Sequence, residues 1–368
     1  MTEALEPKLF EQVLERKFGW STCFLCGCRL GKKNRSDEHV FPKWLQRKYK
    51  LVDERLRLPN GTTVPYRQLT IPCCRVCNTK HLHPIEKTMS QAVIGGPRAV
   101  KALDPWYIFI WLGKMFYGIL YRELFLLWDR ARGNKGTITT KEILREYRMH
   151  HLLLQSVRVP MQFVGCFPAS ILIVETQEPE DKRLSWDYSD DPQSMFIGCR
   201  MGSVGLICML HDGGAQQAIF PRCPGLDIDV PHKLHPIQFR EVLARVRYQG
   251  MLFNRIPKFV LWQSEEETKV TMNPLMGFNS KPIFDPWNQL LYSRVLATMT
   301  GAPIKLLFRA PDRAWTWLKT PAGTLSEMPL KQYPVSCHTT LHVATSAGSL
   351  GRSSNASGGD SPDRTRGS

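Results

Sequence analysis

Two pairs of cysteines share one spacing in this 368-residue sequence. In each pair two residues separate the cysteines, which are Cys23 and Cys26, then Cys74 and Cys77. A C-x-x-C turn can bring both of its sulfurs to one ion, and two such turns complete a tetrahedral four-thiolate Zn²⁺ site. Four thiolates leave no open coordination position. We therefore expect a structural zinc ion that joins two distant segments of the chain.

Residues between and just after these pairs are suited to hydrolysis of a phosphodiester bond. Glu38 and His39 lie between the pairs, Asn78 follows the last cysteine, and His83 and Glu86 come shortly after it. The reaction needs an activated water, a Lewis acid at the phosphate and groups that hold the geometry. A neutral histidine can take a proton from water. Carboxylates can bind a hard cation such as Mg²⁺, with substrate phosphate and water as further ligands.

Together these residues make the segment 21–90, about a quarter of the chain, resemble the HNH endonucleases, also called ββα-metal nucleases. The resemblance is strongest to members with zinc knuckles. It rests on Glu-His-Val-x-Pro-x-Trp-Leu between the cysteine pairs, and on Cys-x-x-Cys-Asn followed by Leu-x-x-Ile-Glu. It implies a metal-dependent endonuclease with His39 as general base and Asn78 orienting the His39 segment. It also implies Glu38 and Glu86 as ligands of a catalytic Mg²⁺ or Mn²⁺.

The second ligand of the catalytic metal has two candidates. If a helix begins at Pro84, Glu86 lies in its first turn, where a carboxylate often stabilises a helix end for structural reasons alone. His83 lies three residues before Glu86, on the same face of a helix that covers both, and is the alternative ligand. Asp37 is expected to be a solvated neighbour of Arg35, with ligation in place of its neighbour Glu38 as the alternative. Cys28 and Cys73 are likewise alternatives to neighbouring zinc ligands.

Positive charge is concentrated near these residues. The chain has 49 Lys and Arg against 33 Asp and Glu, a net charge of +16, and residues 1–100 alone hold 18 basic and 9 acidic side chains. This excess favours a polyanionic partner. We expect Lys43, Arg47 and Lys48 to contact backbone phosphates of nucleic acid, chiefly double-stranded DNA, without reading its sequence. Trp44 is expected to pack behind the site. A homo-oligomer is also compatible with the sequence.

A membrane partner is not expected. The most apolar stretch, 106–128, contains Lys114, Arg122 and Glu123, which are costly at bilayer depth. We interpret it as a buried or amphipathic helix of a soluble domain. No secretion signal is evident, so we expect a cytoplasmic protein whose eleven cysteines are reduced or bind metal.

The elements that must position these residues indicate an α+β fold. The pattern predicts an N-terminal helix over 1–20, a zinc-stabilised nuclease module over 21–100, a helical and then β-rich accessory domain of unknown role over 101–333, and a disordered tail over 334–368. Within the module we expect a helix over 41–50 and a hairpin over 55–69.

The accessory domain is predicted to begin with helices and to continue with strands. Helical patterns cover 105–157 with a break at 133–136, and Thr139 with Glu142 form a capping box for the second helix. Strand signals dominate 161–263, a helix over 236–253 interrupts them, and a last helix covers 286–300. His150 and His151 are expected at the polar edge of a helix.

Two other functions fit part of this pattern. The zinc fold can bind nucleic acid without cutting it, or it can mediate protein contacts in a regulatory protein. The presence of Glu38, His39 and Asn78 together argues against the first, since binding alone does not require them. The positive charge of the first hundred residues argues against the second.

Overall fold

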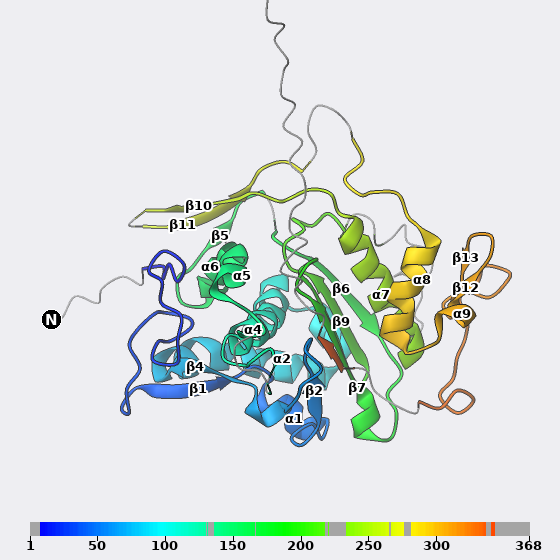
Figure 1. Cartoon of the computed structure of the whole chain (residues 1–368), viewed down its shortest axis with the longest axis horizontal. Helices are drawn as coiled ribbons and strands as arrows, with labels where there is room; N and C mark the ends of the chain where they lie inside the picture. The colour runs from blue at the N-terminus through cyan, green and yellow to red at the C-terminus, as the bar shows by residue number, and fades with distance from the viewer. Residues whose placement is uncertain are drawn as a thin grey trace, which may run out of the picture.

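The computed structural model describes residues 8–342 except 130, 132–135, 166, 218–219, 221–232, 265, 276–280 and 336–339. It is a mixed α+β structure of helices and several small sheets, as expected (Figure 1). Residues 1–7 of the predicted N-terminal helix and 343–368 of the predicted tail lie outside the described residues.

The cysteine-rich segment is organised around two antiparallel strands. These are β1 (Arg35–His39) and β4 (Thr70–Cys74), which pair with Glu38 opposite Ile71. Between them lie α1 (Lys43–Lys48), β2 (Arg55–Arg57), β3 (Thr63–Pro65) and the 3-10 turn η1 (Tyr66–Gln68). The chain leaves β4 into the π-helical turn η2 (Cys77–Leu82) and then α2 (His83–Gly95). The expected helix and hairpin of this segment are present, each shorter than predicted.

A group of helices follows this segment. They are α3 (Pro97–Lys101), α4 (Pro105–Glu123), α5 (Lys141–Glu146), α6 (Arg148–Leu154) and the 3-10 turn η4 (Gln155–Val157). The sequence of α4 is apolar on nearly every side, and most of its residues are buried, as a helix of this pattern requires. The side chain of Asp104 caps its first turn by accepting from the N–H of Trp106. Among the described residues we find no helix with the length and apolarity needed to cross a bilayer.

A five-stranded sheet follows the helices, with strand order β14-β7-β8-β9-β6. Its strands are β6 (Ser170–Glu175), β7 (Trp186–Asp191), β8 (Phe196–Met201), β9 (Val204–Met209) and β14 (Thr340–His342). Neighbouring strands are antiparallel except β14, which runs parallel to β7. Every residue of β7, β8 and β9 is buried, because the sheet is covered on both faces.

One face of the sheet packs against α7 (Pro236–Leu252), beside which lies α8 (Gln289–Thr300) (Figure 1). The remaining elements are small. They are β5 (Gln162–Phe163), η5 (Lys182–Ser185), β10 (Phe259–Gln263), β11 (Thr268–Met272), α9 (Ile304–Leu307), β12 (Phe308–Arg309) and β13 (Arg313–Ala314). A three-stranded sheet of order β10-β11-β5 lies away from the five-stranded one (Figure 1).

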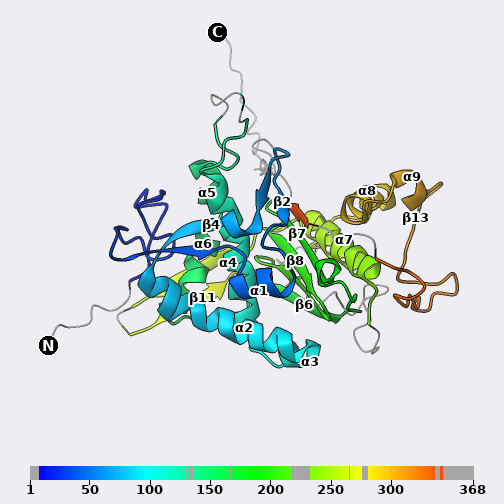
Figure 2. The same ribbon diagram turned by 90° about the horizontal axis from the view of Figure 1, so that it is seen from below.

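The opposite face of the sheet packs against the cysteine-rich segment (Figure 2). The ring of Phe41 lies 5.0 Å from that of Tyr188 and 6.2 Å from that of Trp186, and Tyr66 accepts a hydrogen bond from the indole of Trp186. These residues belong to one hydrophobic core that also includes α4. The boundary expected near residue 100 therefore separates elements that share a core.

Two predicted terminal features differ from the structure. Residues 8–20 form turns and no helix, since Arg16 adopts a φ of 53° and Gln155 binds both backbone polar groups of Phe10. Residues 340–342, within the predicted disordered tail, form β14, because His342 binds buried carboxylates. The ring of His342 pairs with Asp190 and Glu123, and these contacts hold the short strand at the edge of the sheet.

Two details of the helical region also differ. The residue that caps α5 is Thr140, whose hydroxyl accepts from the N–H of Ile143, while Thr139 is buried and donates to Glu123. His150 and His151 are fully buried and not at a polar edge. Each ring binds the backbone carbonyl of a distant segment through Nε2, which partly compensates for its burial, while Nδ1 of His150 has no hydrogen-bond partner among the described residues.

Candidate functional site

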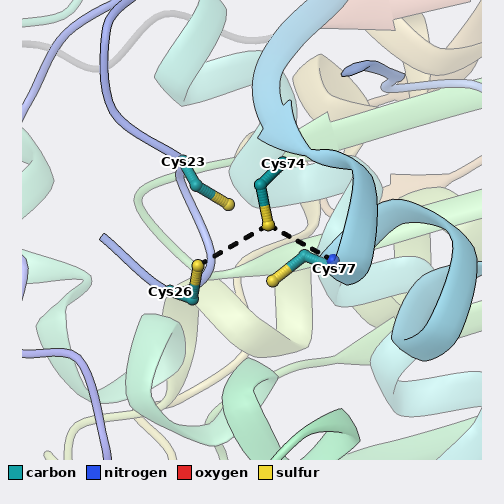
Figure 3. Close-up of side chains that lie close together, drawn as sticks. All are labelled: Cys23, Cys26, Cys74 and Cys77. Carbon is teal, nitrogen blue, oxygen red and sulfur yellow. Dashed lines mark hydrogen bonds between the residues drawn. The ribbon is translucent and has the colours of Figure 1, made fainter. Parts of the chain in front are cut away.

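The four cysteines expected to bind zinc lie together in space (Figure 3). They are Cys23, Cys26, Cys74 and Cys77, and their sulfur atoms all lie within 4.8 Å of one another. The sulfurs of Cys26 and Cys74 are 3.8 Å apart, and the N–H of Cys77 donates to the Cys74 sulfur at 3.3 Å. A turn near the N-terminus thus meets the junction of β4 and η2.

The first cysteine turn needs a glycine to close. The N–H of Gly27 donates to the carbonyl of Cys23, and Gly27 has a φ of +71°, which favours glycine. A Cβ atom at this position would lie 2.3 Å from the ring of Phe10. The turn therefore combines a left-handed backbone with close packing, and both conditions fix the direction of its sulfurs.

The cysteine cluster fits a tetrahedral Zn²⁺ ion. A Zn–S distance of about 2.3 Å places the sulfurs of such a site roughly 3.8 Å apart, so small shifts suffice for binding. Hydrogen bonds from Cys23, Cys26 and Cys77 lower the pKa of Cys74 below its usual range, while the pKa values of these three thiols are raised in turn, so the four sulfurs share one negative charge centred on Cys74. Four sulfur ligands would leave no position for substrate.

Cys28 and Cys73 lie beside this cluster without completing it. The thiol of Cys73 is 4.0 Å from the Cys23 sulfur and donates to the carbonyl of Cys74. Cys28 is half-buried, and burial raises the pKa of its thiol to about 12. Among the described residues, we find no second group of three or more side chains placed to bind a metal ion.

A second polar cluster surrounds the ammonium group of Lys114. This nitrogen, from α4, lies 2.7 Å from Oε1 of Glu38, 2.9 Å from Oε1 of Glu86 and 2.9 Å from the carbonyl oxygen of His39. Lys114 and Glu38 are 3% and 5% exposed, and Glu86 is 20% exposed. The structure thus brings the two predicted carboxylate ligands to one nitrogen that reasoning from sequence did not assign.

Burial and charge both shape this second cluster. Burial raises the pKa of Glu38 to about 7, although Lys114 acts in the opposite direction, and the nearby Glu86 carboxylate raises it further. Burial disfavours the charged amine of Lys114, but the two carboxylates outweigh it and raise its pKa above its usual value. When Glu38 and Glu86 are both ionised, their negative charge exceeds the single positive charge of Lys114, which favours a further cation.

His39 lies next to this cluster and is half-buried. Burial lowers the pKa of His39 below its usual value, and the positive charges of Lys43 and Lys114 lower it further. The imidazole is therefore neutral at physiological pH. A neutral ring can accept a proton, as the predicted general base must.

Asn78 connects the helical side of the site to the strand that carries His39. Its side-chain amide, in η2, donates to the hydroxyl of Ser36 at 3.1 Å and lies 3.5 Å from the carbonyl oxygen of Asp37. These contacts hold the part of β1 that lies just before His39. Asp37 itself accepts from Arg35 on the surface, as expected of a solvated neighbour.

The positions of Glu86 and His83 distinguish these two candidates for the second ligand of the catalytic metal. Glu86 lies in the first turn of α2 and reaches Lys114, which also contacts Glu38. His83 is exposed, and we find no hydrogen bond or ion pair for it among the described residues. Geometry therefore favours Glu86 over His83.

Sequence reasoning used the charge of Lys114 only to argue against a membrane span, although it also indicates a buried partner. Lys114 is a charged residue in the middle of an apolar stretch, and such residues are rarely buried without partners. This pattern indicates a partner but does not identify it, because Lys114 is 76 residues from Glu38 in the chain.

The predicted phosphate contacts differ in exposure. Lys43 and Arg47 are exposed on α1, and Lys43 lies near enough to His39 to affect its pKa. Lys48 is partly buried, which lowers its pKa, and it lies near Glu178 of the following domain. Trp44 stacks on Trp111 with ring centroids 6.0 Å apart, so it packs behind the site as expected.

Comparison with known proteins identifies no family for this chain. No family model, curated protein or solved structure matches the chain. Contacts and chemistry of the residues themselves support the function considered next.

Proposed function

We propose that this protein is a metal-dependent endonuclease of the HNH type, which hydrolyses phosphodiester bonds in DNA. The convergence of Glu38 and Glu86 beside a neutral His39 carries the proposal. β1 supplies Glu38 and His39, α2 supplies Glu86, and the cysteine cluster lies where β4, the partner strand of β1, continues toward α2. A purely structural zinc knuckle has no need for paired carboxylates beside a histidine.

The carboxylates fit a hard divalent cation. Mg²⁺ and Mn²⁺ prefer oxygen ligands and are commonly held by one or two carboxylates, with water and phosphate as the rest. Lys114 and the mutual contact of the two carboxyl groups occupy only part of their oxygen lone pairs, so Glu38 and Glu86 keep others for a cation. When bound there, the cation would polarise the scissile phosphate and stabilise developing negative charge.

The proposed role of His39 is to accept a proton from the attacking water. The water oxygen forms a bond to phosphorus as its proton passes to the imidazole, and the ester oxygen leaves with the electrons of the broken bond. Asn78 keeps β1 in place during this step through Ser36. Lys43, exposed next to His39, is placed to contact a neighbouring backbone phosphate.

The zinc cluster has a different proposed role. It joins the turn that contains Cys23 to the start of the helical side that contains Asn78 and Glu86. A closed thiolate site of this kind contributes folding free energy and takes no part in the chemistry.

The test is cleavage of supercoiled plasmid by purified protein with and without Mg²⁺ or Mn²⁺. We expect His39→Ala to fold, keep its zinc and cleave about 10²–10⁴-fold more slowly, the usual contribution of a positioned base. His83→Ala is the matched control, since this histidine is nearby but exposed, and it should cleave like the wild type.

Two outcomes would contradict the proposal. Equal cleavage by His39→Ala and wild type would exclude His39 as the base. DNA binding without cleavage under any divalent ion would instead support a non-cleaving, zinc-dependent binding module.

A further inference from the structure

We propose that Lys114 is a positioning residue, which holds the carboxylates of Glu38 and Glu86 together so that they can bind one divalent cation. The inference rests on the proposed function, because it concerns the same metal site. It adds a residue from α4, which lies outside the segment that resembles a nuclease.

The contacts of Lys114 support a positioning role. Its nitrogen binds a side chain of β1, a backbone carbonyl of β1 and a side chain of α2. Three oxygens from two elements therefore share one donor, which is near the full capacity of an ammonium group. Loss of any one of these three oxygen contacts would therefore disturb the other two.

Electrostatics explains why such a residue is needed. Two carboxylates at short range repel each other, most strongly where water is excluded. Glu38 is nearly fully buried, so its charge depends on a close partner. With Lys114 between them, Glu38 and Glu86 can converge before any divalent ion arrives.

Lys114 does not reach substrate itself. Its side chain is 3% exposed, whereas Glu86 is 20% exposed and is the member of the cluster that solvent reaches best. A cation from solution would therefore approach beside Glu86, with Lys114 behind the carboxylates. The segment 21–90 alone would lack this support, so α4 is part of the site.

If Lys114 instead opposed metal binding, its replacement would change the affinity for the divalent ion in the opposite direction. If its ammonium only repels the divalent ion or occupies its place, removal of the charge should strengthen metal binding. If it positions the carboxylates, removal should weaken binding. The affinity for Mn²⁺ alone, without substrate, separates the two.

The experiment measures free Mn²⁺ by electron paramagnetic resonance during titration of the zinc-loaded full chain. We expect Lys114→Met to bind Mn²⁺ about 10–100-fold more weakly than the wild type, the usual effect of losing a group that orients metal ligands. Lys114→Arg keeps the charge and should recover part of the affinity. Tyr117→Phe is the matched control, because it removes a buried polar group from the same helix and should bind like the wild type.

A double variant covers the case in which Lys114→Met does not fold. Lys114→Met combined with Glu38→Gln removes both buried charges, which is less disruptive than removing one. If Lys114 acts through Glu38, this double variant binds Mn²⁺ no more weakly than Glu38→Gln alone. An additive further loss would overturn the inference.

The remaining outcomes separate the two proposals. Mn²⁺ binding that Glu38→Gln weakens but Lys114→Met leaves unchanged or strengthens overturns the role of Lys114 and keeps the metal site. Wild-type protein that binds no Mn²⁺ beyond the level of Glu38→Gln overturns the metal site and the role of Lys114 together.

Discussion

The buried charges around Lys114 and those of the five-stranded sheet are partnered in different ways. In the sheet, Asp187 of β7 accepts from Arg200 at 2.6 Å and from Arg240 at 3.0 Å, and Asp191 accepts from Arg247 at 3.0 Å. Among these residues, on the face that packs against α7, cations therefore equal or outnumber carboxylates; on the other face His342 is shared by Asp190 and Glu123, all three of them fully buried. Around Lys114 the ratio of the α7 face is reversed, with two carboxylates for one ammonium.

This difference distinguishes charges that only stabilise the fold from charges that can still bind a ligand. The carboxylates of Asp187 and Asp191 are at most 3% exposed and are already neutralised by guanidinium groups from β8 and α7. They tie the helix to the sheet and attract no further cation. Glu86 is partly exposed and shares its counter-ion, so its cluster can still bind a divalent ion. Excess charge and access together, more than burial alone, indicate a ligand site.

The largest effect is expected from the thiolate cluster. Cys74→Ser should lower both zinc content and folding, since structural zinc sites contribute roughly 10 kcal/mol or more of apparent binding free energy. Elemental analysis and circular dichroism measure the two. Cys208→Ser, at a buried cysteine of β9, should keep its zinc. Equal zinc in Cys74→Ser and wild type would contradict the assignment.

A smaller loss is expected in the sheet. Asp187→Asn removes the negative charge between Arg200 and Arg240, and breaking a buried pair of this kind costs about 3–5 kcal/mol. Urea denaturation measures this loss. The variant that remains folded should keep its affinity for Mn²⁺, because the charges of the sheet serve structure. Loss of Mn²⁺ binding by folded Asp187→Asn would remove the distinction between the two regions.

His150 is a buried base without a charged partner among the described residues, and its titration should make the free energy of unfolding depend on pH. Burial lowers the pKa of His150 to about 4, below the 6.5 expected when unfolded, so between these values the unfolded chain binds more protons. The stability from this group is present above pH 6.5 and is lost as the pH falls toward 4. In His150→Gln, the slope of unfolding free energy in this window should be shallower by up to about 1.4 kcal/mol per pH unit. An unchanged slope in urea titrations would exclude this origin.

The smallest effect is expected at the basic surface. Lys43→Ala should reduce the slope of log affinity for DNA against log salt by about one unit, because one phosphate contact is lost. Lys48→Ala is the matched control, since Lys48 is partly buried next to Glu178 and should leave the slope unchanged. Fluorescence anisotropy at several salt concentrations measures both. Equal slopes for wild type and Lys43→Ala would place this lysine away from the phosphates.

Sequence was sufficient where the signal is local. The spacing of the cysteine pairs predicts their cluster, and the resemblance to HNH endonucleases implies that Glu38 and Glu86 approach one another, as their shared contact with Lys114 shows. Helices α7 and α8 lie near the positions that their sequence patterns predict. Each of these inferences starts from a motif or a pattern that can be recognised within a short segment.

Sequence was insufficient where a polar residue is buried by a distant partner. His150 and His151 read as polar, yet they bind the carbonyls of Gly113 and Phe24 in the core. Lys114 depends in the same way on residues far away in the chain. Hydrophobic patterns treat such side chains as surface residues, because the partner that compensates for burial is set by tertiary structure.

The short strand β14 has a consequence for synthesis of the chain. His342 binds Asp190 across 152 residues of sequence, and both groups are fully buried. At roughly 5–20 residues per second, a ribosome needs about 8–30 s to travel from one to the other. Throughout that interval the outer edge of β7 has no partner strand, and unpaired strand edges favour aggregation. A nascent chain would therefore depend on late translation, or on a chaperone, to protect a sheet whose other strands have already emerged.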